Sequence, residues 1–396
     1  MTRSTSAAPA PSFPRIVPVL TDGTVTLRAH QRADVDAIVE QCADPESMAW
    51  TSVPRPYRKA DALRFLALIR EAWGRPDGNR YWAIEVADES TGAPVYAGTI
   101  DLRPRPGRIA EIGFGLHPAA RGRGVMAAAV RLLAAYGFEE GLGDGSLDRI
   151  HWAARVGNFA SRRVAWACGF VQHGTIPQMP GPTSAGPAGE RVPCDHWVAS
   201  LSRLAPMVPL TPWLDIPVIE DDGVRLRAWR EDDIEHAEPL DGPSHHMPLG
   251  AAPSDLTFEY WLLVRRERAA RGEGITWCIA DARTDRPLGA VMVFDHGAPI
   301  SEPGAELGYF LFPSARGRGV ATAASDLAVD HAFAPKAKGG LGLSRLSAVT
   351  AADNVASNSV LERLGFVRWG VEHATDLLPD GTWENAYHWE LLRSLR

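Results

Sequence analysis

Residues 120–125 of this chain have the sequence ARGRGV, and the same six letters recur at residues 315–320. Each copy follows an apolar stretch that predicts a strand and precedes apolar residues spaced at a helical period. Glycines let a backbone approach an anion closely, and the free N–H groups at a helix start favour negative charge. The arginines add positive charge for phosphate oxygens. The sequence therefore predicts two anion-binding loops, each between a strand and a helix.

The two loops belong to a longer internal repeat. Further matches lie at offsets of 199, 195 and 196 residues: 27–29 with 226–228, 110–114 with 305–309, and Asn158-x-x-Ser161 with Asn354-x-x-Ser357. A chain of 396 residues also exceeds the usual size of one hydrophobic core. We expect one domain, duplicated. The predicted parts are a disordered tail at 1–14, a domain at 15–205, a Pro-rich linker at 206–222 and a domain at 223–396.

Each half has a mixed pattern that predicts an α+β fold. In the first half alternation predicts strands and helical periodicity predicts helices. The predicted strands are 24–29, 81–87, 95–102, 109–116, 149–154 and one around Trp197, and the predicted helices are 34–42, 124–138 and 160–168. The second half is expected to repeat this order.

Composition narrows the class of protein. The start of the chain lacks the apolar core of a secretory signal, and no stretch is long and apolar enough to span a membrane. The four cysteines have no metal-binding spacing, which favours a reducing cytoplasm. Residues 1–205 hold 23 basic and 20 acidic side chains, and residues 206–396 hold 18 and 28. Neither balance indicates a nucleic-acid-binding protein.

The loops lack both the G-x-G-x-x-G dinucleotide fingerprint and the Gly-Lys-Ser/Thr of a nucleotide-binding loop. The pattern of Arg316, Gly319 and Ala321 resembles the acyl-CoA loop of the GNAT N-acyltransferase superfamily. With Asn-x-x-Ser and a following Gly-Phe, each half resembles its RimJ/RimL type of ribosomal-protein N-terminal acetyltransferases. The resemblance implies two tandem domains, each with a splayed mixed sheet flanked by helices. It also implies acetyl-CoA as the acyl donor and direct transfer to an amine.

The resemblance also implies which residues contact CoA. Met126 departs from the small residue usual at the end of the loop, where Ala321 conforms. Asn158 and Asn354 open a helix, either as caps alone or as caps that also contact CoA. The implied CoA-binding residues are Leu116, Arg121, Gly122, Arg123, Gly124, Val125, Met126 and Asn158 in the first half, and Leu311, Arg316, Gly317, Arg318, Gly319, Val320, Ala321 and Asn354 in the second.

Attack on a thioester requires a neutral amine and therefore a base. Glu111 and Glu306 are candidates, because a carboxylate within an apolar strand tends to have a raised pKa. The alternative is a structural carboxylate that holds a neighbouring arginine. The tyrosine that many members use as general acid is absent. The resemblance to the RimL type implies Ser161 and Ser357 as acids instead; the alternatives are that they are only helix N-terminal residues, and that bound water or no group is the acid.

The halves differ where the acceptor should bind. The first half has Trp50 and Tyr57 between its first two strands, whereas the second has His245 and His246. No other residue completes a recognisable ligand spacing for these histidines, so we expect no metal. The different loops predict different acceptors for the two halves.

Two classes of function follow. The first is a cytoplasmic acetyl-CoA-dependent N-acetyltransferase for the primary amine of a peptide N-terminus or of a small, antibiotic-like metabolite. The second is a CoA-binding or sensing module in which one or both halves are inactive, and another acyl-CoA is a further alternative. Met126 makes the first half the candidate for an inactive scaffold. The sequence does not indicate the oligomeric state, which can be a monomer or a homodimer.

Overall fold

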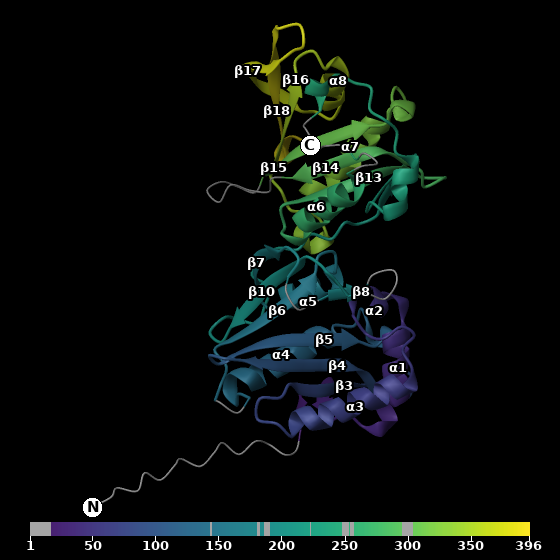
Figure 1. Cartoon of the computed structure of the whole chain (residues 1–396). Coiled ribbons are helices and arrows are strands. Elements are labelled where there is room, and N and C mark those ends of the chain that lie inside the picture. The colour runs from purple at the N-terminus through teal and green to yellow at the C-terminus, as the bar shows by residue number, and fades with distance from the viewer. Residues whose placement is uncertain are drawn as a thin grey trace, which may run out of the picture. The chain divides into compact units, whose positions relative to one another are not determined.

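The structure of the chain is a computed structural model that describes residues 17–142, 145–179, 183–185, 191–221, 223–247, 253, 257–294 and 304–396. The tail predicted at 1–14 lies outside these residues. The chain divides into two compact units, Met1–Leu210 and Thr211–Arg396, which we call unit 1 and unit 2 (Figure 1). Each unit is built around one mixed eight-stranded sheet, as expected for a duplicated α+β domain.

The sheet of unit 1 has the strand order β1-β2-β3-β4-β5-β6-β10-β7. Its strands are β1 (Leu20–Thr21), β2 (Val25–Arg28), β3 (Arg80–Ala87), β4 (Pro94–Arg105), β5 (Ile109–Leu116), β6 (Arg149–Arg155), β7 (Val171–Ile176) and β10 (His196–Ser202). A separate two-stranded sheet pairs β8 (Thr183–Ala185) with β9 (Arg191–Pro193). All strands of the large sheet pair antiparallel except β5 and β6, which are parallel.

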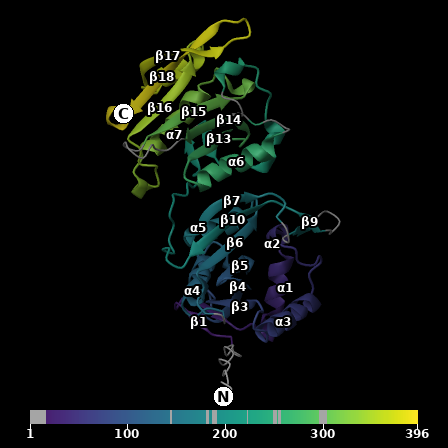
Figure 2. The same cartoon turned by 60° about the vertical axis from the view of Figure 1, so that its left-hand side comes forward.

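Helices cover both faces of the unit 1 sheet. They are α1 (Val35–Ala43), α2 (Pro45–Trp50), α3 (Lys59–Trp73), α4 (Val125–Glu139) and α5 (Phe159–Ala167). Figure 2 shows α1 and α3 on one side of the sheet and α4 with α5 on the other. The predicted helices at 34–42, 124–138 and 160–168 correspond to α1, α4 and α5, whereas α3 was not predicted.

The parallel strands of each unit are paired over only part of their length. Strand β5 pairs with β6 from Ile109 to Ile112 and then separates from it, so its last four residues, 113–116, have no partner on that side. In unit 2 the equivalent pairing of β15 with β16 covers Gly304 to Glu306. The splayed sheet that the resemblance implied is therefore present in both units. The gap opens beside the ARGRGV loop, because the loop follows directly after β5 or β15.

Unit 2 has the same strand order, β11-β12-β13-β14-β15-β16-β18-β17. Its strands are β11 (Ile219–Asp221), β12 (Val224–Arg227), β13 (Gly274–Asp281), β14 (Pro287–Phe294), β15 (Gly304–Leu311), β16 (Arg345–Ala351), β17 (Val367–Leu377) and β18 (Trp383–Leu392). Its α-helices are α6 (Phe258–Ala270), α7 (Val320–Phe333) and α8 (Val355–Arg363). None of the described helices in either unit combines the length and the apolar character needed to cross a membrane.

The expectation that unit 2 repeats every element was wrong between its second and third strands. Where unit 1 has α1 and α2, the described residues of unit 2 form only two 3-10 turns, η3 (Glu231–His236) and η4 (Ser244–His246). Pro239, Gly242 and Pro243 lie in this stretch, and prolines interrupt a helix because they lack the N–H donor.

A buried tryptophan anchors the start of each unit. Trp82 on β3 and Trp277 on β13 are fully buried, and their indole N–H groups donate to the carbonyl oxygens of Pro18 and Pro217 at 2.9 and 3.0 Å. Pro217 lies in the segment expected to be a linker at 206–222, which also contains β11. The division between the two units, after Leu210, falls inside the same segment.

Candidate active site

Both ARGRGV loops connect a strand end to a helix start. In unit 1 the loop runs from β5 through the 3-10 turn Pro118–Ala120 to α4, and in unit 2 from β15 through Pro313–Ala315 to α7. Gly124 and Gly319 are the N-cap residues, with φ of 74° and 78°, and neither helix has a side-chain cap. The first N–H groups of α4 and α7 are therefore open to an anion.

The glycines of the loops are needed for their backbone conformation. Gly122 and Gly317 have φ of 73° and 71°, in the left-handed region that favours glycine. A Cβ placed on any of the four loop glycines meets no atom within 4 Å. Each loop thus keeps an open surface above the helix start.

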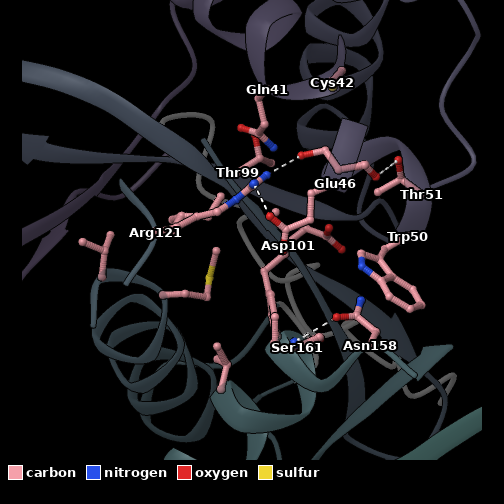
Figure 3. A pocket seen from close by; sticks show the side chains of 18 of the residues that line it. Gln41, Cys42, Glu46, Trp50, Thr51, Thr99, Asp101, Arg121, Asn158 and Ser161 are labelled. Carbon is pink, nitrogen blue, oxygen red and sulfur yellow. Dashed lines mark hydrogen bonds and ion pairs between the residues drawn. The ribbon is translucent and has the colours of Figure 1, made fainter. Parts of the chain in front are cut away.

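The first arginine of the unit 1 loop binds a helix of the same unit. Arg121 donates to Asp44 and to Glu46, both at 2.6 Å, and to the Ser47 hydroxyl at 2.9 Å. The hydrogen bond from this guanidinium is the largest cause that lowers the pKa of Asp44. Arg121 therefore fixes α2 beside the loop (Figure 3).

Two further loop arginines also pair with carboxylates. Arg123 lies 2.8 Å from Glu89, and Arg316 donates to Asp241 at 2.5 Å. A direct contact of these arginines with phosphate therefore stays a prediction, and the backbone N–H groups are the open donors of the loop.

A cavity of about 880 Å³ in unit 1 begins at the loop. Its walls come from the loop and α4, from β4 and β5, from the α1–α2 region and from the start of α5 (Figure 3). The predicted site residues that line it are Leu116, Arg121, Gly122, Gly124, Val125, Met126, Asn158 and Ser161. Glu111 and Arg123 are not among its lining residues. Met126 is buried without filling the cavity.

Sequence analysis missed the most distinctive group in this cavity, Asp101 on β4. Its side chain is 8% exposed, and Oδ1 accepts a hydrogen bond from Arg103 Nε at 2.7 Å. Burial raises the pKa of Asp101 to about 6, although Arg103 acts in the opposite direction. The signal in the sequence was one charged residue within an otherwise uncharged strand stretch, 94–102.

Glu111, the predicted base of unit 1, lies in an ion-pair cluster. Its carboxylate accepts from Arg103 Nη1 at 2.9 Å and from Arg105 Nη2 at 3.0 Å. Arg103 therefore bridges Asp101, which lines the cavity, and Glu111, which does not. These contacts match the structural alternative for Glu111, a carboxylate that holds a neighbouring arginine.

The predicted Asn-x-x-Ser residues begin α5 and α8. The side chain of Asn158 accepts from the backbone N–H of Ser161 at 3.0 Å, and Asn354 accepts from that of Ser357 at 3.1 Å. Both asparagines are therefore helix caps. The Ser161 hydroxyl also accepts from the indole N–H of Trp152 at 3.1 Å, which leaves its own proton able to donate.

Ser357 has a different partner in unit 2. Its hydroxyl lies 2.8 Å from the hydroxyl of Tyr309, whose pKa burial raises to about 12. Phe114 takes the position of Tyr309 in unit 1 by the repeat offset, so the two serines have different surroundings.

Aromatic and polar residues form the other wall of the unit 1 cavity. Trp50, Tyr57, Phe65, Tyr96 and Phe114 line it together with the carboxylates Glu46 and Asp101. Tyr96 donates to Gln41 at 2.9 Å, and its hydroxyl lies 2.9 Å from that of Thr99. This wall can hold the apolar body of a molecule, and both carboxylates are paired with arginines that also line the cavity, Arg121 and Arg103.

Unit 2 has no carboxylate at the position that corresponds to Asp101. Asp101 lies opposite Gly113 in the β4–β5 ladder, and Met292 lies opposite the matching Gly308 in the β14–β15 ladder. By the same register Phe294 replaces Arg103, so Glu306 lies opposite a phenylalanine instead of an arginine. The ARGRGV loop is therefore duplicated, whereas the pair of Asp101 with Arg103 has no counterpart at the same register positions.

His245 and His246 of unit 2 share one hydrogen-bonding partner, the carboxylate of Asp353. Asp353 lies 2.9 Å from His245 Nε2 and 2.7 Å from His246 Nε2. The sequence shows no ligand spacing for the two histidines, but the fold places a third residue of a metal-binding type beside them. Asp353 is 107 residues from His246 in the sequence, so no local spacing could have indicated it.

Comparison with known proteins identifies relatives of both units. A profile described as an acetyltransferase (GNAT) domain matches residues 24–171 and 224–367. The probable N-acetyltransferase YjcK of Bacillus subtilis (strain 168) is 34% identical over 122 residues, 30% of this chain and 62% of that protein. The uncharacterized N-acetyltransferase YoaA of the same organism is 34% identical over 98 residues, 25% of this chain and 51% of that protein. The matches thus span between half and two thirds of the length of these curated relatives.

One similar solved structure is that of RimL, a ribosomal L7/L12 alpha-N-protein acetyltransferase, in complex with coenzyme A. It is 19% identical, with a TM-score of 0.38, and the match covers 47% of this chain and 97% of that chain.

Proposed function

The chain belongs to the acetyltransferase (GNAT) family, and on that premise we propose that it is an acetyl-CoA-dependent N-acetyltransferase whose unit 1 carries out the transfer. The observation that carries the proposal is the buried carboxylate of Asp101 in the cavity that begins at the phosphate loop. The loop supplies a binding place for an anion, and the carboxylate supplies a base.

Acetyl-CoA is proposed to bind along the open end of β5. The uncapped N–H groups at the start of α4 suit its pyrophosphate. The separation of β5 from β6 after Ile112 leaves backbone groups of residues 113–116 free on one side, which suits the amide groups of pantetheine. Leu116 and Val125 line the same cavity and can contact the apolar parts of the cosubstrate.

Asp101 is the proposed general base. With a pKa of about 6, its carboxylate is mostly ionised at neutral pH yet is a stronger base than an exposed aspartate. It takes a proton from the acceptor ammonium, and the neutral amine then attacks the thioester carbonyl. Arg103 holds the carboxylate in place, and Glu111 holds Arg103 from the other side. Glu111 is therefore a positioning residue in this proposal.

Ser161 is the proposed proton donor to the leaving thiolate. Its oxygen accepts a hydrogen bond from Trp152, so its own proton is available on the cavity side. As its proton passes to the sulfur, the serine oxygen takes the proton that the nitrogen of the attacking amine must lose, so the hydroxyl is regenerated. The indole N–H stabilises the partial negative charge on this oxygen during the relay.

The acceptor is proposed to be a primary amine, either a peptide N-terminus or a small metabolite. The aromatic side chains favour an apolar body in the cavity, and the Asp101 carboxylate, although paired with Arg103, is the group that can accept a proton from the amine.

Unit 2 is proposed to bind CoA without catalysing transfer. It keeps the loop and the open start of α7, but Met292 takes the position of the base. This reverses the hypothesis that Met126 marks unit 1 as the inactive half.

The proposal is tested by incubating the full chain with acetyl-CoA and a panel of primary amines while free thiol is measured. Amine-dependent thiol release is expected, and mass spectrometry should find the acetylated amine. Thiol release no faster with any amine than with buffer alone contradicts the proposal.

A further inference from the structure

In each unit, the segment that follows the second strand contacts the residue just before a helix N-cap, Asn158 of α5 or Asn354 of α8. The residues that make this contact differ between the two units. In unit 1 the ring of Trp50 packs against Gly157, where an added Cβ lies 3.3 Å from the ring, and Arg155 stacks on that ring at 5.5 Å. By the repeat offset of 196, the position of Gly157 corresponds to Asp353, and His245 lies, like Trp50, in the segment between the second and third strands of its unit. An aromatic contact in unit 1 is thus replaced in unit 2 by a group of metal-binding residue types.

Three ligand atoms converge in this group. The Nε2 atoms of His245 and His246 lie 2.9 and 2.7 Å from the two carboxylate oxygens of Asp353. The two imidazole rings are 4.4 Å apart between centroids and meet at 71°, so neighbouring residues direct both nitrogens to one place. One ligand atom from each residue lies within 4.8 Å of the others.

The donor types select among cations. Two imidazole nitrogens and one carboxylate oxygen suit zinc and similar transition metals, whereas calcium and magnesium prefer oxygen ligands alone. Such a site with three protein ligands has a fourth position for water. The side chains of His245, His246 and Asp353 are 13%, 23% and 41% exposed, so an ion can reach the group from solvent.

We propose that His245, His246 and Asp353 bind one divalent transition-metal ion of the zinc type in unit 2. The ion joins η4 to the start of α8, because Asp353 directly precedes Asn354, which caps that helix. The ion therefore holds η4 beside the N-cap of α8 in unit 2, the unit in which Met292 takes the position of Asp101. This proposal does not depend on the proposed transfer reaction.

The competing explanation is a carboxylate that accepts hydrogen bonds from the two histidines without a metal. The two explanations differ in one measurable respect, the affinity for Zn²⁺. The test uses the full chain, treated with a chelator and titrated calorimetrically with Zn²⁺, and in parallel with Co²⁺ while visible absorption is recorded. Co²⁺ with nitrogen and oxygen ligands in a four-coordinate site gives absorption bands that hexaaquo Co²⁺ lacks.

Two variants remove ligands with little change in shape. Asp353→Asn keeps a hydrogen-bond acceptor but loses the charge, and the double variant His245→Gln with His246→Gln removes both nitrogens. The matched control is His388→Gln, because His388 lies 3.0 Å from Glu372 in the same unit as a single His–carboxylate pair. Circular dichroism of each metal-free variant checks that it is folded.

We expect one Zn²⁺ per chain, a higher thermal unfolding midpoint with Zn²⁺, and Co²⁺ bands in the wild type and in the control. Each ligand variant should lose more than about tenfold in Zn²⁺ affinity, together with the Co²⁺ bands. The proposal is overturned if the wild type shows no saturable Zn²⁺ binding. It is also overturned if the double variant binds Zn²⁺ as tightly as the wild type.

Discussion

Asp101 and Met292 occupy the same register position in the two sheets, opposite Gly113 and Gly308 respectively. In unit 1 this position carries a buried carboxylate that lines a cavity next to the phosphate loop. In unit 2 the same position carries a side chain that cannot accept a proton. This position therefore differs between the proposed catalytic unit and the proposed binding unit, although both have the sequence ARGRGV in the loop.

The Glu111→Gln variant tests whether Glu111 is the catalytic base or only positions Arg103. If Glu111 only holds Arg103, the variant should lose at most a few-fold in kcat. The negative charge of Glu111 raises the pKa of Asp101, so its removal should lower that pKa. The acid limb of the pH–rate profile should consequently move to lower pH. A loss of about 10² or more in kcat identifies Glu111 as the base instead.

The Gly124→Ala variant tests the loop as the binding place of the CoA pyrophosphate. The φ of 74° at Gly124 is unfavourable for alanine by roughly 1–2 kcal/mol, so the helix start should rearrange and its N–H groups move. We expect a higher KM for acetyl-CoA with a smaller change in kcat, measured by initial rates.

Gly23→Ala is the matched control for this loop variant. Gly23 has φ of 90°, no atom lies within 4 Å of its Cβ position, and it lies in the β1–β2 turn. It should lower the thermal unfolding midpoint in a similar way and leave the KM for acetyl-CoA unchanged. An equal rise in KM from both variants contradicts a specific role of the loop.

The raised pKa of Asp101 also has a cost for stability. Its value in the folded state, about 6, lies above the ordinary 3.8, so the folded protein binds this proton more tightly than the unfolded chain. The free energy of unfolding contributed by this group is therefore largest below about pH 4 and falls as pH rises to about 6.

Asp101→Asn removes this dependence. Relative to the wild type, the variant should gain on the order of 2–3 kcal/mol between about pH 4 and pH 7. Denaturant titrations of both proteins at the two pH values measure this difference. An identical pH dependence of the two proteins contradicts the raised pKa.

Local patterns were enough to predict the frame of the fold. The strand at 109–116 and helix α4 have strong periodicity, and the ARGRGV loops combine glycines with a strand and a helix on either side. The repeat then indicated the duplicated domain. The α-helix predicted directly after β12, as the counterpart of α1, is not formed, because Pro239 and Pro243 interrupt that stretch.

The decisive parts of the site depend on contacts between distant segments. Asp101 was overlooked because its burial and its facing toward the cavity are set by pairing with β3 and β5, which the sequence of β4 does not contain. The apolar strand around Glu111 predicts a catalytic base, but it does not indicate that Arg103 and Arg105 on the neighbouring strand bind the Glu111 carboxylate. Asp353 was missed for the same reason, since the fold alone brings it to His245.

The central claim is that Asp101 is the base of a single catalytic unit. Its most direct test is kcat/KM for the best amine acceptor, measured for wild type and Asp101→Asn between about pH 5 and pH 9. In the wild type the rate should rise with pH through about 6, because the ionised carboxylate is the active form. The variant should be about 10²- to 10⁴-fold slower and lack that limb. A variant within a few-fold of the wild type, with the same pH profile, contradicts the claim.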